Sequence, residues 1–362
     1  MVGYVYLDKE SAVKDFFIIF RFQWKRFNGK FRASSDRICA MPVGTSRDAH
    51  RQMEKATLLL LTAILIAGRA ALLWGQAGEQ EFTARAAQCI EGASPEDCRA
   101  TLQSGLARYP RSAHLYKLLA ALEFKAQRLD AMRDALERAA ALYPSDAETH
   151  QNLALLEVSQ RHYTRAAVHL TNFLRLRPND AQGHLLLGRA YLNLLRPYDA
   201  EREIRQAMAL DGRLPLTHHD LGFVLMNAGR REEALAEFLK EIEANPTFGA
   251  SYLRAGMIEL DRNRIEAAGG FLRQAVERSP EDARAHFHLG RYYLRVKKAD
   301  LAEAQLTEAL RLDPKFIRIH YSLAQALQAQ GKNDEAQREF KLHAELLARN
   351  RSSQGRVSPS DD

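Results

Sequence analysis

Among the residue types that could bind a metal, histidine recurs at a regular spacing in this chain. The set is His150, His184, His218, His286 and His320, and its members are 34 residues apart except that Tyr252 stands between His218 and His286. Imidazole nitrogen is a common metal ligand, but ligands of one ion must each lie about 2 Å from it. Packed helices are separated by about 10 Å, so histidines on successive helices cannot share an ion. We interpret them as packing residues with one ring nitrogen hydrogen-bonded, and we expect no metal and no cofactor.

The remaining reactive residue types do not form a catalytic pattern. There is no serine at a nucleophile elbow followed by Asp and His, and no His-Glu-x-x-His helix. Carboxylates such as Glu232, Glu233, Glu241 and Glu243 resemble ordinary exposed charge. Because catalysis needs groups that converge in a pocket, the sequence predicts a protein that is not an enzyme.

Three cysteines offer one pairing. Cys89 and Cys98 are close in sequence, whereas Cys39 stands in a different kind of segment. In an exported protein an even, closely spaced pair predicts a disulfide. The alternative is two free, small, buried thiols, and both interpretations stay open.

The elements that position these residues repeat with the same period. Small residues recur as Ala154, Gly188, Gly222, Gly256, Gly290 and Ala324, and again as Ala166, Ala200, Ala234, Ala268, Ala302 and Ala336. Prolines follow as Pro178, Pro246, Pro280 and Pro314. Apolar spacing predicts helices over about 181–195 and 199–210, and proline ends the second helix of each pair. One helix pair cannot bury its apolar face alone, so successive pairs must stack.

The order of these residues resembles the tetratricopeptide repeat family. The similarity is clearest in the run His286, Leu289-Gly290, Tyr293, Ala302, Leu306, Ala309 and Pro314, and it covers about 79–348 as eight repeats. The resemblance implies an all-α fold, a right-handed α-solenoid of stacked helix-turn-helix repeats. It also implies a scaffold that binds a protein or peptide, with the first helix of each repeat lining a concave groove. Such repeats serve many unrelated functions.

The resemblance places a set of polar and aromatic residues in that groove: Arg189, Asn193, His219, Phe223, Asn227, Arg254, Arg284, His288, Arg291, Arg295 and Arg318. Among them Arg284, His288, Arg291 and Arg295 fall on one helical stripe. Arginine suits bidentate capture of carboxylates. The stripe therefore predicts binding of an acidic peptide segment or a chain terminus, and the alternative is a solvated face.

Charge argues against a nucleic-acid partner. The net charge is +7, but residues 1–55 hold eleven Lys and Arg against six Asp and Glu, a surplus of five. The repeats are thus close to neutral, unlike a surface that tracks phosphates.

The N-terminal segments predict the cellular compartment in which the repeats lie. Residues 1–55 are a leader that is aromatic and basic over 1–40, and this stretch is absent if translation starts at Met41 or Met53 instead of Met1. The apolar run within 56–77 follows basic residues and ends in small ones, which fits a signal peptide. Read through to Trp74 it also fits a membrane anchor, so membrane association through 56–75 stays open. Either interpretation puts the repeats outside the cytoplasm, in the periplasm or secreted, free or anchored in the inner membrane. A cytosolic regulator is a third option.

At the other end of the chain, residues 349–362 are expected to be a disordered tail.

Overall fold

The computed structural model describes residues 78–90, 92 and 94–354, and these residues are helical with no strand among them. The chain divides after Arg196 into two compact parts, an N-terminal part ending at Arg196 and a C-terminal part starting at Pro197. After a helical stretch at 78–90, the N-terminal part contains α3 Pro95–Arg108, α4 Ala113–Lys125, α5 Leu129–Leu142, α6 Ala147–Ser159, α7 Tyr163–Leu176 and α8 Ala181–Asn193. The C-terminal part contains α9 Pro197–Leu210, α10 Thr217–Asn227, α11 Arg231–Ala244, α12 Gly249–Asp261, α13 Ile265–Arg278, α14 Ala283–Arg295, α15 Ala299–Leu312, α16 Arg318–Ala329 and α17 Asn333–Gln354.

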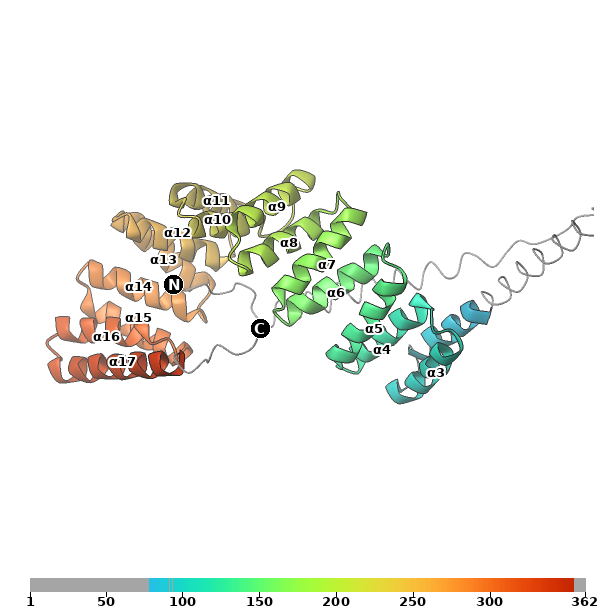
Figure 1. Cartoon of the computed structure of the whole chain (residues 1–362). Helices are drawn as coiled ribbons and strands as arrows, with labels where there is room; N and C mark the ends of the chain where they lie inside the picture. The colour runs from blue at the N-terminus through green and yellow to red at the C-terminus, as the bar shows by residue number, and fades with distance from the viewer. Residues whose placement is uncertain (1–77, 91, 93, 355–362) are drawn as a thin grey trace, which may run out of the picture. The chain divides into compact units, whose positions relative to one another are not determined.

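Each repeat is a pair of antiparallel helices, as Figure 1 shows for α10 with α11 and for the pairs up to α16 with α17. The two helices predicted over 181–195 and 199–210 are α8 and α9. Proline sets several boundaries: Pro197 begins α9, where its missing N–H costs nothing, and α7 ends two residues before Pro178. The prediction of an all-α helical repeat solenoid is confirmed.

The turn inside each repeat has one geometry. A residue with positive φ follows the first helix every 34 positions, and the set is Gln127, Arg161, Leu195, Gly229, Asn263, Lys297 and Gly331. The next backbone N–H then reaches back to the first helix, for example from Lys298 to the carbonyl of Tyr293 at 2.9 Å. This is the Schellman closure, which satisfies carbonyl groups that the end of a helix leaves without partners.

The small-residue ladders lie where the two helices of a repeat cross. Ala154, Ala166 and Ala234 are fully buried, and so are Ala268, Ala302 and Ala324. A Cβ added to Gly222 would stand 2.9 Å from the Phe238 ring and 3.1 Å from the Ala234 carbonyl oxygen. The second helix therefore approaches the first through its own small residue and its bulky residue four positions later.

The recurrent histidines connect each first helix to its surroundings. His286 Nε2 lies 2.9 Å from the carbonyl oxygen of Pro280, and His150 and His184 contact Pro144 and Pro178 in the same way at 3.0 Å. The other ring nitrogen of His286 lies 2.8 Å from Gln305 Oε1 of the paired helix. In the same way Nδ1 of His218 meets Glu237 and Nδ1 of His320 meets Glu339, each at 2.6 Å. His286 therefore connects the first helix both to the proline turn before it and to its partner helix, and the other histidines of the set make at least one of these two contacts.

Cys89 and Cys98 form a disulfide with 5.6 Å between their Cα atoms. The disulfide joins the stretch 78–90 to α3. The same region is packed by a cluster of buried apolar residues that includes Ile90, Leu102 of α3 and Leu115 of α4. The repeat at this end has no preceding repeat among the described residues, so the crosslink supplies part of the missing support.

The C-terminal boundary differs from the expectation. Helix α17 continues to Gln354, beyond the residue 348 at which the repeat pattern ends. Extending a helix that is already formed requires no new nucleation, so Arg349–Gln354 need no apolar anchor to join it. The leader 1–55, the apolar segment 56–77 and the rest of the expected tail, 355–362, lie outside the described residues. None of the helices within the described residues combines the length and apolar character that a membrane span requires.

Candidate functional site

Three first helices of the C-terminal part, α12, α14 and α16, adjoin one another. Helix α14 contacts both α12 and α16 directly, although each of these belongs to a different repeat. We call the side formed by α10, α12, α14 and α16 the inner face, and the side of α11, α13 and α15 the outer face. Side chains from separate repeats can therefore act together on the inner face.

Arginines lie over aromatic rings on the inner face. The Arg254 guanidinium carbon lies 4.8 Å from the centre of the Phe223 ring. Arg291 of α14 and Arg318 of α16 lie 5.8 Å and 5.6 Å from the centre of a single ring, Phe287. A guanidinium over an aromatic face keeps its N–H edges available for hydrogen bonds.

His288 lies among these arginines and is only 8% exposed. Burial, and then the positive charges of Arg291 and Arg254 followed by those of Arg318 and Arg284, lower its pKa well below the ordinary 6.5. The imidazole is therefore neutral near pH 7. The four arginines that act on His288 belong to α12, α14 and α16, so positive charge from three repeats lies around this side chain.

Arg291 experiences the same crowding. Burial first, and then the nearby charge of Arg318, lower the pKa of Arg291. Within the described part of the chain, neither Arg291 nor Arg318 has a carboxylate at ion-pair distance. Two like charges held together without a counter-ion favour an anionic ligand.

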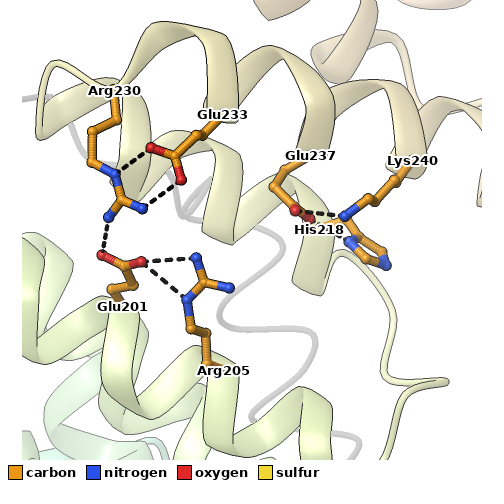
Figure 2. A network of polar contacts seen from close by, with 7 residues as sticks. All are labelled: Glu201, Arg205, His218, Arg230, Glu233, Glu237 and Lys240. Atoms are coloured by element: carbon orange, nitrogen blue, oxygen red, sulfur yellow. Dashed lines mark hydrogen bonds and ion pairs between the residues drawn. The ribbon is translucent and has the colours of Figure 1, made fainter.

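Charged residues at α9, α10 and α11 form two paired clusters. Figure 2 shows Arg230 between Glu233 and Glu201, with nitrogen–oxygen distances of 2.6 and 2.7 Å, and Arg205 on the other side of Glu201. In the second cluster of the same figure, Glu237 accepts from Lys240 and contacts His218. These charges are paired, whereas Arg291 and Arg318 have no carboxylate at ion-pair distance among the described residues.

A hollow of about 320 Å³ opens beside these two arginines. It is lined by Phe287 and Arg291 of α14, by Arg318, Tyr321, Ser322 and Gln325 of α16, and by His343 of α17. The His343 Nδ1 lies 3.0 Å from the carbonyl oxygen of Ile317, which requires that nitrogen to carry the proton. The lining contains guanidinium, hydroxyl and amide groups and no carboxylate, so it suits a ligand that accepts hydrogen bonds.

The structure separates the predicted stripe on α14 into different roles. Arg284 bonds Asp282 at 3.0 Å, and Arg295 donates to the carbonyl oxygen of Leu260 at 2.9 Å. With His288 buried, Arg291 is the residue of the stripe that lines the hollow, together with Arg318.

The other predicted groove residues are dispersed. His219 is 2% exposed and meets Ser251 at 2.9 Å, so it lies within the packing instead of on a surface. Phe223 is nearly buried beneath Arg254, and Asn227 is exposed at the end of α10. Asn193 and Arg189 belong to the N-terminal part, where the Asn193 amide donates to the Arg189 carbonyl at 2.8 Å.

Several residues of the hollow were absent from the predicted groove, namely Phe287, Tyr321, Ser322, Gln325 and His343. Gln325 and Ser322 stand 34 positions after Arg291 and His288, which were predicted, so the repeat register was a signal that would have found them. His343 comes from a second helix, and the register gave no signal for it. Among the described residues no group of three or more potential metal ligands lies together.

Comparisons with known proteins agree with the architecture. Models of the tetratricopeptide repeat match residues 152–212, 219–283 and 256–316, and a further tetratricopeptide repeat model matches 306–338. No curated protein sequence matches the chain.

Solved structures share the fold at low sequence identity. The C-terminal part of a repeat protein from Cytophaga hutchinsonii is 14% identical with a TM-score of 0.52, and the match covers 67% of this chain and 99% of that one. A tetratricopeptide repeat protein from Parabacteroides merdae is 13% identical with a TM-score of 0.51, covering 69% and 98%. The Cut9-Hcn1 hetero-tetramer of APC/C is 20% identical with a TM-score of 0.50 over 68% of this chain, which spans about half, 48%, of that structure's chain.

Proposed function

The chain belongs to the tetratricopeptide repeat family, and from that premise we propose that it is a non-enzymatic scaffold that binds a protein or peptide on its inner face. The observation that carries the proposal is the contact of α14 with both α12 and α16, which brings side chains of successive repeats onto one surface. An extended ligand can contact several repeats there at once, and stacked repeats commonly use such surfaces for binding.

Site-specific photo-crosslinking in cells tests this function. A photoreactive amino acid at Gln325, exposed on α16, should capture a defined partner, whereas the same probe at Thr307, exposed on the outer helix α15, should not. Equal capture at both positions, or none at Gln325, would count against an inner-face scaffold. The comparison also controls for non-specific capture, because both sites lie in the same part of the chain.

We further propose that the repeats act outside the cytoplasm, in the cell envelope. The support is the apolar segment 56–77 with its basic flank, together with the Cys89–Cys98 disulfide, a type of crosslink that persists in oxidising compartments. Cell fractionation with mass spectrometry of the mature N-terminus tests this. A soluble envelope protein that begins near residue 78 is the expected result, and a full-length cytoplasmic protein with free thiols would overturn it.

A membrane-anchored accessory or assembly subunit of an envelope enzyme or secretion complex is the second candidate. It is favoured by the apolar residues that continue past Arg69 to Trp74, which together approach the length of a membrane span of about 20 residues. The same fractionation separates the two, because an anchor stays in the membrane pellet with residues 56–75 intact.

A further inference from the structure

We propose that the hollow between α14, α16 and α17 binds a carboxylate side chain of an acidic peptide segment, held by Arg291 and Arg318. This inference rests on the proposed scaffold function and names the chemistry of its ligand. It also replaces the four-residue stripe on α14 with a pair of arginines from two successive repeats.

The geometry of the two arginines supports a bidentate role. Both guanidinium groups lie near the Phe287 ring, at 5.8 and 5.6 Å, and the ring is 1% exposed and so fixed in place. Contact with a fixed ring restricts the two arginine side chains, which reduces the entropy lost when a ligand binds. Planar N–H pairs match the two oxygen atoms of a carboxylate.

The charge balance supports an anion in particular. In the part of the chain that the structure describes, the hollow contains two cations and no carboxylate. The charge of Asp261 partly offsets the lowering of the Arg291 pKa, but the two residues form no ion pair among the described residues. Binding an anion would relieve the repulsion between Arg291 and Arg318, so occupancy is favoured electrostatically as well as by hydrogen bonding.

The size and the walls indicate a peptide side chain. A volume of about 320 Å³ is at the lower end for ligand pockets, which run from about 300 to 1,000 Å³. It therefore accommodates one or two side chains. Tyr321 is 47% exposed and supplies an apolar wall, while Ser322 and Gln325 offer further hydrogen bonds.

Neighbouring positive charge argues for an extended ligand. Arg254 on α12 lies over Phe223 and, like Arg291 and Arg318, lowers the pKa of the buried His288. The positive potential thus continues from the hollow along the inner face toward α12. A peptide with acidic residues on either side of the anchoring carboxylate matches this distribution better than a small isolated anion does.

Selection from a displayed library of random linear peptides on the full chain tests the proposal. We expect enrichment of Asp and Glu, and at least a tenfold loss of affinity for the selected peptides in Arg318→Gln and in Arg291→Gln. The matched control is Arg311→Gln, which removes an exposed arginine paired with Glu308 on α15 and should change affinity less than twofold.

A second variant keeps the test valid where loss of the half-buried Arg291 harms folding. Gln325→Glu places a carboxylate at the exposed edge of the hollow without removing a buried group. This variant should also lower the affinity for the acidic peptides at least tenfold. Its affinity for peptides in which Gln replaces Glu should not fall. Unchanged melting temperatures would show that these losses are local.

The outcomes separate this inference from the scaffold function. Peptides without acidic enrichment, or with equal affinity for Arg318→Gln, would overturn the carboxylate site. So would phosphopeptides that bind more than tenfold better than their glutamate counterparts. If the library yields no ligand the carboxylate site also falls, while crosslinking at Gln325 decides the scaffold function independently.

Discussion

Gly256 of α12 lies so close to Leu272 of α13 that an added Cβ would stand 2.7 Å from the Leu272 Cγ and 3.2 Å from its backbone nitrogen. One repeat later Gly290 has the same relation to Leu306, with a corresponding distance of 2.6 Å. Contacts this short require the neighbouring helix to move. The close crossing of the paired helices in these two repeats therefore depends on the absence of a side chain.

Gly256→Ala should destabilise the α12–α13 repeat by about 1–3 kcal/mol, the usual cost of overpacking a tight core. The control is Gly270→Ala in α13, where an added Cβ meets nothing within 4 Å. That change should stabilise by about 0.5–1 kcal/mol, because alanine favours a helix over glycine. Hydrogen exchange of the two helices measures both effects. A stabilising Gly256→Ala would contradict the proposed crossing.

The turns within repeats offer a reciprocal test. Lys297 and Gly331 occupy the same position of successive repeats, both exposed and both with positive φ, 58° and 80°. A left-handed conformation costs a residue with a Cβ about 1–2 kcal/mol. Lys297→Gly should therefore stabilise its repeat by up to about 1 kcal/mol, and Gly331→Lys should destabilise by about as much. Denaturation by urea measures both, and changes of equal sign would disprove the account.

These turns also show how far sequence alone could go. The period of 34 located every turn, but only Gly229, Gly331 and, more weakly, Asn263 carry a residue type that signals positive φ. At Leu195 and Lys297 the rest of the repeat imposes the conformation against the residue's own preference. The repeat architecture was therefore predictable from spacing, whereas the backbone state of individual turn residues was not.

The candidate site was predictable in part. Arg291 and Arg318 were identified from their place on first helices, and both line the hollow. The position on a helical wheel could not tell that His288 would be buried or that Arg295 would reach the Leu260 carbonyl. Those outcomes depend on the neighbouring repeat, whose side chains fill or leave open the space above each residue.

A buried ion pair stabilises the junction of successive repeats in the N-terminal part. Arg133 Nε of α5 lies 2.6 Å from Glu157 of α6, whose side chain is fully buried. Arg133→Met should cost about 3–5 kcal/mol, because it leaves a buried carboxylate without its main partner. The double variant Arg133→Met with Glu157→Leu should cost clearly less, since no charge remains buried.

A double-mutant cycle followed by urea denaturation measures this coupling. Arg138→Met, which removes an exposed arginine from the same helix, is the control and should change stability by less than about 0.5 kcal/mol. If the double variant is as unstable as the sum of the two single variants, the pair contributes no coupling and this interpretation is wrong.

Acidification should loosen α14 through His288. Its folded-state pKa is well below the ordinary 6.5, chiefly because of burial and then because of the surrounding arginines. The unfolded state therefore binds the proton first, and stability that is complete above about pH 6.5 falls as the pH decreases toward the folded pKa. His169 in α7, whose pKa burial and His150 also lower, acts in the same direction in the N-terminal part.

Hydrogen exchange of α14 at about pH 7.5 and about pH 5.5, corrected for the intrinsic rate, measures the effect of His288. His288→Gln should flatten this dependence, while the exposed control His114→Gln should leave it unchanged. If α14 of the wild type is equally protected at both pH values, the burial of His288 among four arginines does not make stability depend on pH, and this prediction is wrong.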